Sequence, residues 1–91
     1  MVLLSQRIEE LLLPVPARLA RYLLDLSTQQ GRVDVHLPVP KHELANRLGT
    51  VPETLSRTFD RLKRAEVIRM SGDHELIEIL SFEKLHRLAQ D

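Results

Sequence analysis

Two short helices with almost no chain between them are the feature that most constrains the fold of this 91-residue chain. Residues 40–48 have the apolar spacing of a helix, and Pro52 begins another, where its fixed φ and missing N–H are harmless. Only residues 49–51 join them. Gly49 permits a sharp bend, and Ala45 supplies the small side chain that a close helix crossing needs. The spacing therefore predicts two helices that cross steeply and share a buried corner.

The second of these helices, predicted over residues 52–65, has two chemically different faces. At about 100° per residue, one face collects the mostly apolar side chains of Leu55, Thr58, Phe59 and Leu62. The opposite face carries charged and hydroxyl side chains, which are Glu53, Ser56, Arg57, Asp60, Arg61 and Arg64. We expect the first face to be buried and the second to offer hydrogen-bonding groups to a partner.

The rest of the chain supplies elements that pack around this pair. Apolar spacing predicts a helix over residues 17–28 and a final helix after Ser81, which is a good N-cap. A short strand is predicted where Val33, Val35 and Leu37 alternate with polar residues, and these three are expected to face inward. The inner face of the final helix is expected to hold Phe82, Leu85, Leu88 and Ala89.

Residues 67–79 predict a β-hairpin, because two apolar runs flank a Gly72-Asp73 turn. The predicted fold class is therefore mainly α with a small β-sheet: a winged helix-turn-helix with a three-helix core and a β-hairpin wing. This domain is assigned to residues 14–91. Residues 1–13 have the apolar spacing of a helix that Pro14 ends, and we interpret them as the end of a dimerisation-type helix.

Composition narrows the functions that such a domain can have. The chain has no cysteine, which excludes disulfides, thiolate-bound zinc and a cysteine nucleophile. Its four histidines lack metal-binding spacing, and no catalytic order of residues or phosphate loop is present, so we expect neither a metal site nor an enzyme. Aromatic residues make up 3% of the chain, too few for a platform that stacks single-stranded bases. No apolar run approaches the roughly 20 residues of a membrane span, so we expect a cytoplasmic protein.

The distribution of charge is more informative than its sum, which is zero. Residues 40–64 hold six basic and three acidic side chains, whereas residues 65–91 hold three basic and six acidic ones. Positive charge therefore concentrates in the two adjoining helices. Phosphate neutralisation dominates affinity for nucleic acids, so this is the segment expected to approach a DNA backbone.

The chemistry of the outer face of residues 52–65 suits base edges in the major groove of DNA. Arg57 can donate two hydrogen bonds to guanine O6 and N7, and Glu53 can accept one from the amino group of cytosine or adenine. Ser56 can contact either kind of partner. We expect these three to read bases. Phosphate contacts are expected from Lys41, His42, Thr50, Thr54 and Arg61.

These two helices resemble the signature of the Crp/Fnr superfamily of transcription regulators. The resemblance covers most of residues 17–80 and rests on Lys41-His42-Glu43-Leu44-Ala45, Leu48-Gly49 and Pro52-Glu53-Thr54-Leu55-Ser56-Arg57. The serine before the arginine resembles the Fnr branch, which implies a half-site of the TTGAT type. Pro-Glu-Thr at 52–54 is also similar to regulators of denitrification and the nitric-oxide response.

The resemblance implies partners and a larger protein. It implies double-stranded DNA as the ligand, a homodimer in the full-length protein, and RNA polymerase as a further contact. It also implies an N-terminal sensor domain that binds a nucleotide, haem or an iron–sulfur cluster, while this chain itself would hold no cofactor. Residues 1–13 would match the end of the long dimer helix.

The sequence departs from the family pattern in three respects. Pro52 replaces the arginine with which the Crp branch makes an extra guanine contact, so that contact is excluded here. Pro40 and Val51 occupy N-cap positions where the family often has serine or threonine, which weakens both caps. Asp73 stands in the wing where many members have a basic residue, which disfavours contact between wing and phosphate.

A winged helix can also be a protein-interaction module that never contacts DNA. Such a module tends to expose apolar residues on the outer face of the second helix. Residues 53–64 expose polar and charged residues instead, which favours the DNA-binding interpretation.

Overall fold

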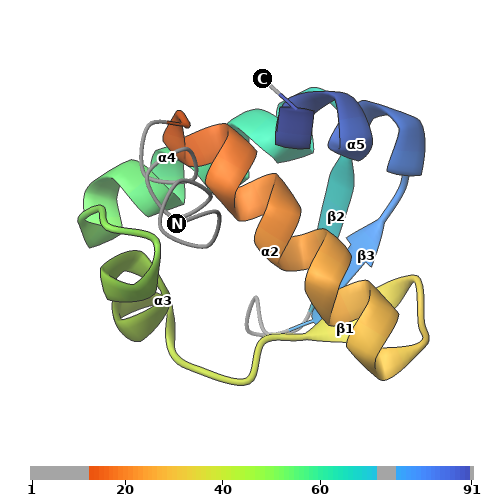
Figure 1. The fold of residues 1–91 in the computed structure, drawn as a ribbon, viewed down its shortest axis with the longest axis horizontal. Helices are drawn as coiled ribbons and strands as arrows, with labels where there is room; N and C mark the ends of the chain where they lie inside the picture. Colours follow the sequence, from red (N-terminus) through yellow and green to blue (C-terminus); the bar gives the residue numbers. More distant parts are fainter. Residues whose placement is uncertain (1–12, 72–75, 91) are drawn as a thin grey trace, which may run out of the picture.

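The structure, a computed structural model, describes residues 13–71 and 76–90 and contains four helices and three strands there (Figure 1). The helices are α2 (Val15–Gln30), α3 (Lys41–Arg47), α4 (Pro52–Arg64) and α5 (Phe82–Gln90). The strands are β1 (Asp34–His36), β2 (Ile68–Ser71) and β3 (Leu76–Ile79). The predicted mainly helical fold with a small sheet is confirmed. The predicted helix end over residues 1–13 lies almost wholly outside the described residues, as does the Gly72-Asp73 turn.

The three strands form one antiparallel sheet in the order β1-β3-β2. The predicted hairpin strands β2 and β3 pair with each other, with Arg69 opposite Glu78. β1 joins from far along the chain and pairs with the other side of β3, where Val35 lies opposite Ile77. The wing hairpin is therefore extended by a strand that precedes both helices of the helix-turn-helix.

Two predictions about inward-facing residues are wrong. Val33 is 54% exposed because it lies just before β1. Its carbonyl still joins the sheet, since it accepts a hydrogen bond from Ile79 N–H at 2.8 Å. Phe82 is 36% exposed because it is the first residue of α5, before the helix has turned onto the core. Ser81 does cap α5 as predicted, since its Oγ accepts a hydrogen bond from Lys84 N–H at 3.2 Å.

Helix α2 crosses the middle of the domain and organises the core (Figure 1). It packs against α5, β1 and α4. Its inner residues Leu19, Ala20 and Leu23 have no exposed surface. Gly31 ends it in the left-handed conformation, φ 64°, and donates its N–H to Ser27 O. This glycine cap lets the chain reverse towards β1.

The connection between α3 and α4 is held from both sides. Gly49 has φ 70°, and Thr50 N–H donates to Ala45 O at 2.9 Å. The Arg18 guanidinium, from α2, donates to the Leu48 carbonyl through Nη1 and to the Leu13 carbonyl through Nε at 2.9 Å. Ala45 is fully buried where the helices meet, as its small size predicted. One side chain therefore ties the start of the domain to the helix-turn-helix turn.

Substituting the turn glycine tests this arrangement. A Cβ on Gly49 would lie 3.0 Å from Arg18 Nη1, whereas a Cβ on Gly31 would meet nothing within 4 Å. Both glycines have positive φ, so alanine costs about 1–2 kcal/mol of backbone strain at either position. We expect Gly49→Ala to lower the free energy of unfolding by roughly 1–2 kcal/mol more than Gly31→Ala, because it also displaces a charged hydrogen bond. Urea denaturation measures both free energies of unfolding. Equal losses would show that the Arg18 side chain moves aside without loss of stability.

Candidate nucleic-acid interface

Helix α4 is fixed in orientation by its buried face. Leu55, Phe59 and Leu62 are at most 2% exposed, and Thr58 is 5% exposed and donates its hydroxyl to the Thr54 carbonyl at 2.8 Å. These are the four residues that the helical spacing assigned to the inner face. Rotating α4 about its axis would bring charged residues into the core. The polar face opposite the buried one must therefore point away from the domain.

The three predicted base-reading residues lie together on that opposite face. Glu53, Ser56 and Arg57 are all exposed and occupy the first turn and a half of α4. Within the described part of the chain, none of their side chains makes a hydrogen bond or an ion pair. An acceptor, a hydroxyl and a bidentate donor are therefore free to bind groups outside the protein.

The predicted phosphate-binding residues fall on both flanks of this strip. Lys41 lies at the junction of α3 and α4, with Nζ 5.3 Å from the centre of the Phe59 ring. It borders the flank of α4 that carries Asp60 and Lys63. Thr54 and Arg61, seven residues apart and thus nearly in line on a helix, mark the other flank. A helix in the major groove lies between two phosphate backbones, so groups on both flanks fit that geometry.

The Lys41 flank carries an ion pair and a cation–π contact. Lys63 Nζ lies 3.1 Å from the Asp60 carboxylate, and this hydrogen bond lowers the pKa of Asp60. Burial lowers the pKa of the Lys41 ammonium, as does the positive charge of Lys63, whereas Asp60 raises it. Lys41 is thus a half-buried cation beside an aromatic ring, a contact worth about 0.5–2 kcal/mol.

The other two predicted phosphate-binding residues lie in α3 and in the connection between α3 and α4. His42 is exposed in the first turn of α3, and Thr50 is half-buried in the connection. Neither Pro40 nor Val51 supplies a side-chain cap, as their types predicted. The first-turn N–H groups of Glu53 and Thr54 consequently have no side-chain cap within the described segments, and they can donate to an anion.

Sequence reasoning missed two contacts that position this interface. Arg18 holds the turn between the helices, but its partner Leu48 is 30 residues away and no local pattern links them. Phe59 was assigned to the core, which is correct, but its ring also carries Lys41. That contact needs the crossing angle of α3 and α4, which the spacing does not specify.

Neither a metal-binding cluster nor a membrane-spanning helix is found in the described ranges. Residues 13–71 and 76–90 contain no group of three or more histidine, cysteine, aspartate or glutamate side chains that could hold a metal ion. Among the helices described, none has the length and apolar character needed to cross a bilayer.

The crossed helices, the exposed polar face of α4 and the strands that follow it define a winged helix-turn-helix domain. The family model described as Crp-like helix-turn-helix domain matches residues 17–88. The chain belongs to this family, the DNA-binding domain type of Crp/Fnr transcription regulators, and the predicted resemblance is confirmed.

Individual relatives agree with this assignment. The chain is 41% identical over 75 residues to "Probable transcriptional regulator flp" from Lacticaseibacillus casei, which covers 82% of this chain and 33% of that protein. It is 35% identical over 72 residues to nitrogen fixation regulation protein FixK from Rhizobium meliloti, and the match covers 78% of this chain and 34% of that protein. A solved CRP/FNR-family transcriptional regulator from Thermus thermophilus matches with a TM-score of 0.74 and 32% identity, over 96% of this chain and 46% of that one. The chain spans about a third of the curated relatives.

The separation of the two faces of α4 predicts unequal effects of substitution on stability. Leu55→Ala removes a fully buried side chain and should lower the free energy of unfolding by about 2–5 kcal/mol. Arg57→Ala removes an exposed side chain that has no partner among the described residues, and it should change the free energy of unfolding by less than about 0.5 kcal/mol. Thermal and urea unfolding followed by circular dichroism measure both. A loss above about 1 kcal/mol for Arg57→Ala would mean that this side chain has a structural role.

Proposed function

We propose that this domain binds double-stranded DNA sequence-specifically, with α4 in the major groove of a TTGAT-type half-site. The observation that supports it best is the set of three exposed side chains, Glu53, Ser56 and Arg57, without partners in the described structure. They lie on a helix whose orientation is fixed by burial. Within residues 13–71 and 76–90, nothing uses their hydrogen-bonding capacity.

Each side chain has a chemical role in this proposal. Arg57 pairs with guanine through O6 and N7, and Glu53 accepts from the amino group of cytosine or adenine. Ser56 contacts a neighbouring base edge. The phosphate backbones on the two sides of the groove are contacted by Lys41 and by Thr54 with Arg61, with His42 and Thr50 near the turn. A domain of zero net charge binds DNA in this way because its positive charge is local.

We further infer that this domain acts within a longer transcription regulator. The support is that the chain spans about a third of relatives whose names describe regulators. In this proposal the regulator is a homodimer whose two copies of α4 read a palindrome, and it contacts RNA polymerase. An N-terminal sensor domain would bind a nucleotide, haem or an iron–sulfur cluster. A single domain contacts one half-site, so its affinity is far below that of the dimer.

The proposal is tested with a fluorescent TTGAT–ATCAA palindrome and a scrambled duplex, by anisotropy at two salt concentrations. We expect tighter binding to the palindrome, weaker at high salt because counterions are released. Arg57→Ala should reduce affinity for the palindrome by about 5–150-fold, the value of one bidentate base contact. The control is Arg87→Ala, which removes another exposed arginine, from α5, and should leave binding unchanged.

Each of the other results has a definite meaning. Salt-dependent binding without preference for the palindrome would contradict the half-site while retaining DNA as the ligand. No binding at low salt, even after two copies are joined by an N-terminal leucine zipper, would contradict DNA binding. It would favour a protein-interaction module instead.

A further inference from the structure

Among the described residues, four large apolar side chains are exposed: Val33, Val51, Leu80 and Phe82. Val33 precedes β1, Leu80 follows β3, and Phe82 begins α5. Val51 is the most exposed of the four, at 58%, and it lies at the N-terminal end of α4. It therefore adds an apolar group to a surface whose other candidate contacts are polar.

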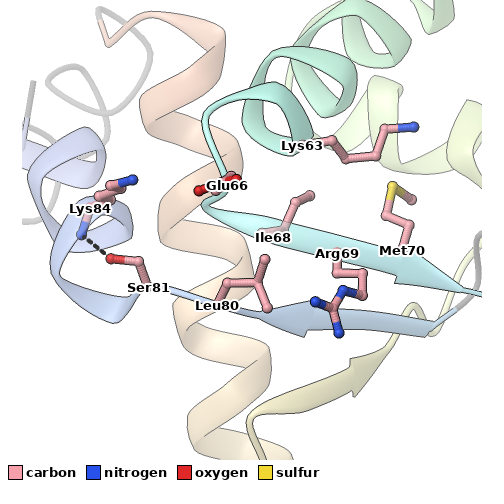
Figure 2. Close-up of a pocket in the computed structure, with 8 residues that line it drawn as sticks. All are labelled: Lys63, Glu66, Ile68, Arg69, Met70, Leu80, Ser81 and Lys84. Carbon is pink, nitrogen blue, oxygen red and sulfur yellow. Dashed lines mark hydrogen bonds between the residues drawn. The ribbon is translucent and has the colours of Figure 1, made fainter.

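The surroundings of Leu80 show what the other exposed positions lack. Leu80 lines an open pocket of about 680 Å³ beside β2 (Figure 2). Each lysine and arginine of that lining already has a partner among the described residues, in the pairs Lys63–Asp60, Arg69–Glu78 and Lys84–Ala65 carbonyl. The charged groups around Leu80 therefore do not select a ligand.

Val51, by contrast, lies beside a group that is free for a ligand. The next two residues along the chain, Pro52 and Glu53, are also exposed. The Glu53 carboxylate has no partner within residues 13–71 and 76–90. When a helix lies in the major groove, its N-terminal residues are the ones that reach base edges. Val51 is thus at the same end of α4 as a predicted base-reading residue.

The backbone and the type of side chain together restrict the position of the Val51 methyl groups. Val51 is the N-cap of α4, with the extended backbone angles φ −108° and ψ 157°, and its carbonyl accepts from Leu55 N–H at 3.1 Å. An N-cap side chain lies over the first turn of its helix. Valine is also restricted at χ1, because its Cβ is branched. This apolar surface is therefore pre-organised and loses little entropy when it is covered.

Thymine presents the chemical group that such a surface fits. Its C5-methyl group lies in the major groove, where it distinguishes thymine from the other bases. A methyl group neither donates nor accepts a hydrogen bond, so the polar side chains on the outer face of α4 cannot recognise it in that way. An apolar side chain can, because burial of one methyl-sized group strengthens binding roughly fourfold.

The spacing along α4 locates this contact relative to the guanine assigned to Arg57. Val51 precedes Arg57 by six positions, or about 9 Å at 1.5 Å per residue. Successive base pairs are about 3.4 Å apart, so the two side chains reach base pairs that are about two to three steps apart. In the TTGAT half-site, the guanine has a thymine two steps away on either side, at the first and the fifth positions.

We propose that Val51 is a further specificity-determining residue, which packs against the C5-methyl group of a thymine two base pairs from that guanine. The thymine is the first or the fifth of the half-site, according to the direction in which α4 runs along the groove. This inference rests on the proposed function, since it requires α4 to lie in the major groove. It adds a contact that recognises thymine through apolar surface, without a hydrogen bond.

The test uses deoxyuridine, whose base differs from thymine only in lacking this methyl group. Anisotropy measures binding of the chain to the fluorescent TTGAT–ATCAA palindrome, with one thymine of each half-site replaced at a time. We expect replacement at the first or the fifth position to weaken binding about three- to fivefold. Val51→Ala should bind the unmodified palindrome about three- to fivefold more weakly, and it should not respond to that replacement.

Val33→Ala is the matched control, because it shortens another exposed valine, at a position before β1. It should keep both the affinity of the unsubstituted chain and its response to deoxyuridine. Val51→Ala retains the backbone carbonyl that binds Leu55 N–H, so circular dichroism should show the same fold for both variants.

The outcomes separate this inference from the proposed function. Preference for the palindrome over the scrambled duplex, without a response to deoxyuridine at either position, would overturn the inference and leave the proposed function intact. An equal response in the unsubstituted chain and in Val51→Ala would also overturn it, since another group would then contact the methyl. Failure to prefer the palindrome would instead contradict the proposed half-site, and this inference with it.

Discussion

The position of α4 depends on a short connection that is bent at a glycine and held by a side chain from another helix. Residues 48–51 join α3 to α4, and the bend requires the left-handed backbone of Gly49. Arg18 from α2 then holds the turn by its Leu48 carbonyl. The same guanidinium also donates to the Leu13 carbonyl. One side chain therefore binds both the chain just before α2 and the turn that orients α4. The outward direction of Glu53, Ser56 and Arg57 follows from this fixed turn together with the buried inner face.

The charge of this domain illustrates why local arrangement outweighs the total. A net charge of zero gives little attraction to DNA at long range, yet six of the thirteen basic residues lie in residues 40–64. The structure divides candidate phosphate contacts between two flanks of α4 and leaves hydrogen-bonding groups between them. Lys63 pairs with Asp60 on one flank, so not every basic residue is free. The positive charge available to a ligand is therefore smaller and better placed than the count suggests.

The sequence by itself determined the order of the elements, the two faces of α4 and the residues expected to read bases. These follow from helical spacing, glycine and proline, whose effects act over a few residues. Tertiary structure decided what depends on distant segments meeting: the pairing of β1 with β3, the exposure of Val33 and Phe82, the ring of Phe59 beneath Lys41, and the contacts of Arg18. The position of β2 at the edge of the described sheet belongs to the same class, because a strand becomes an edge only when its neighbours in the sheet are chosen. Periodicity records which side of an element is apolar, and it holds no information about which element will cover that side.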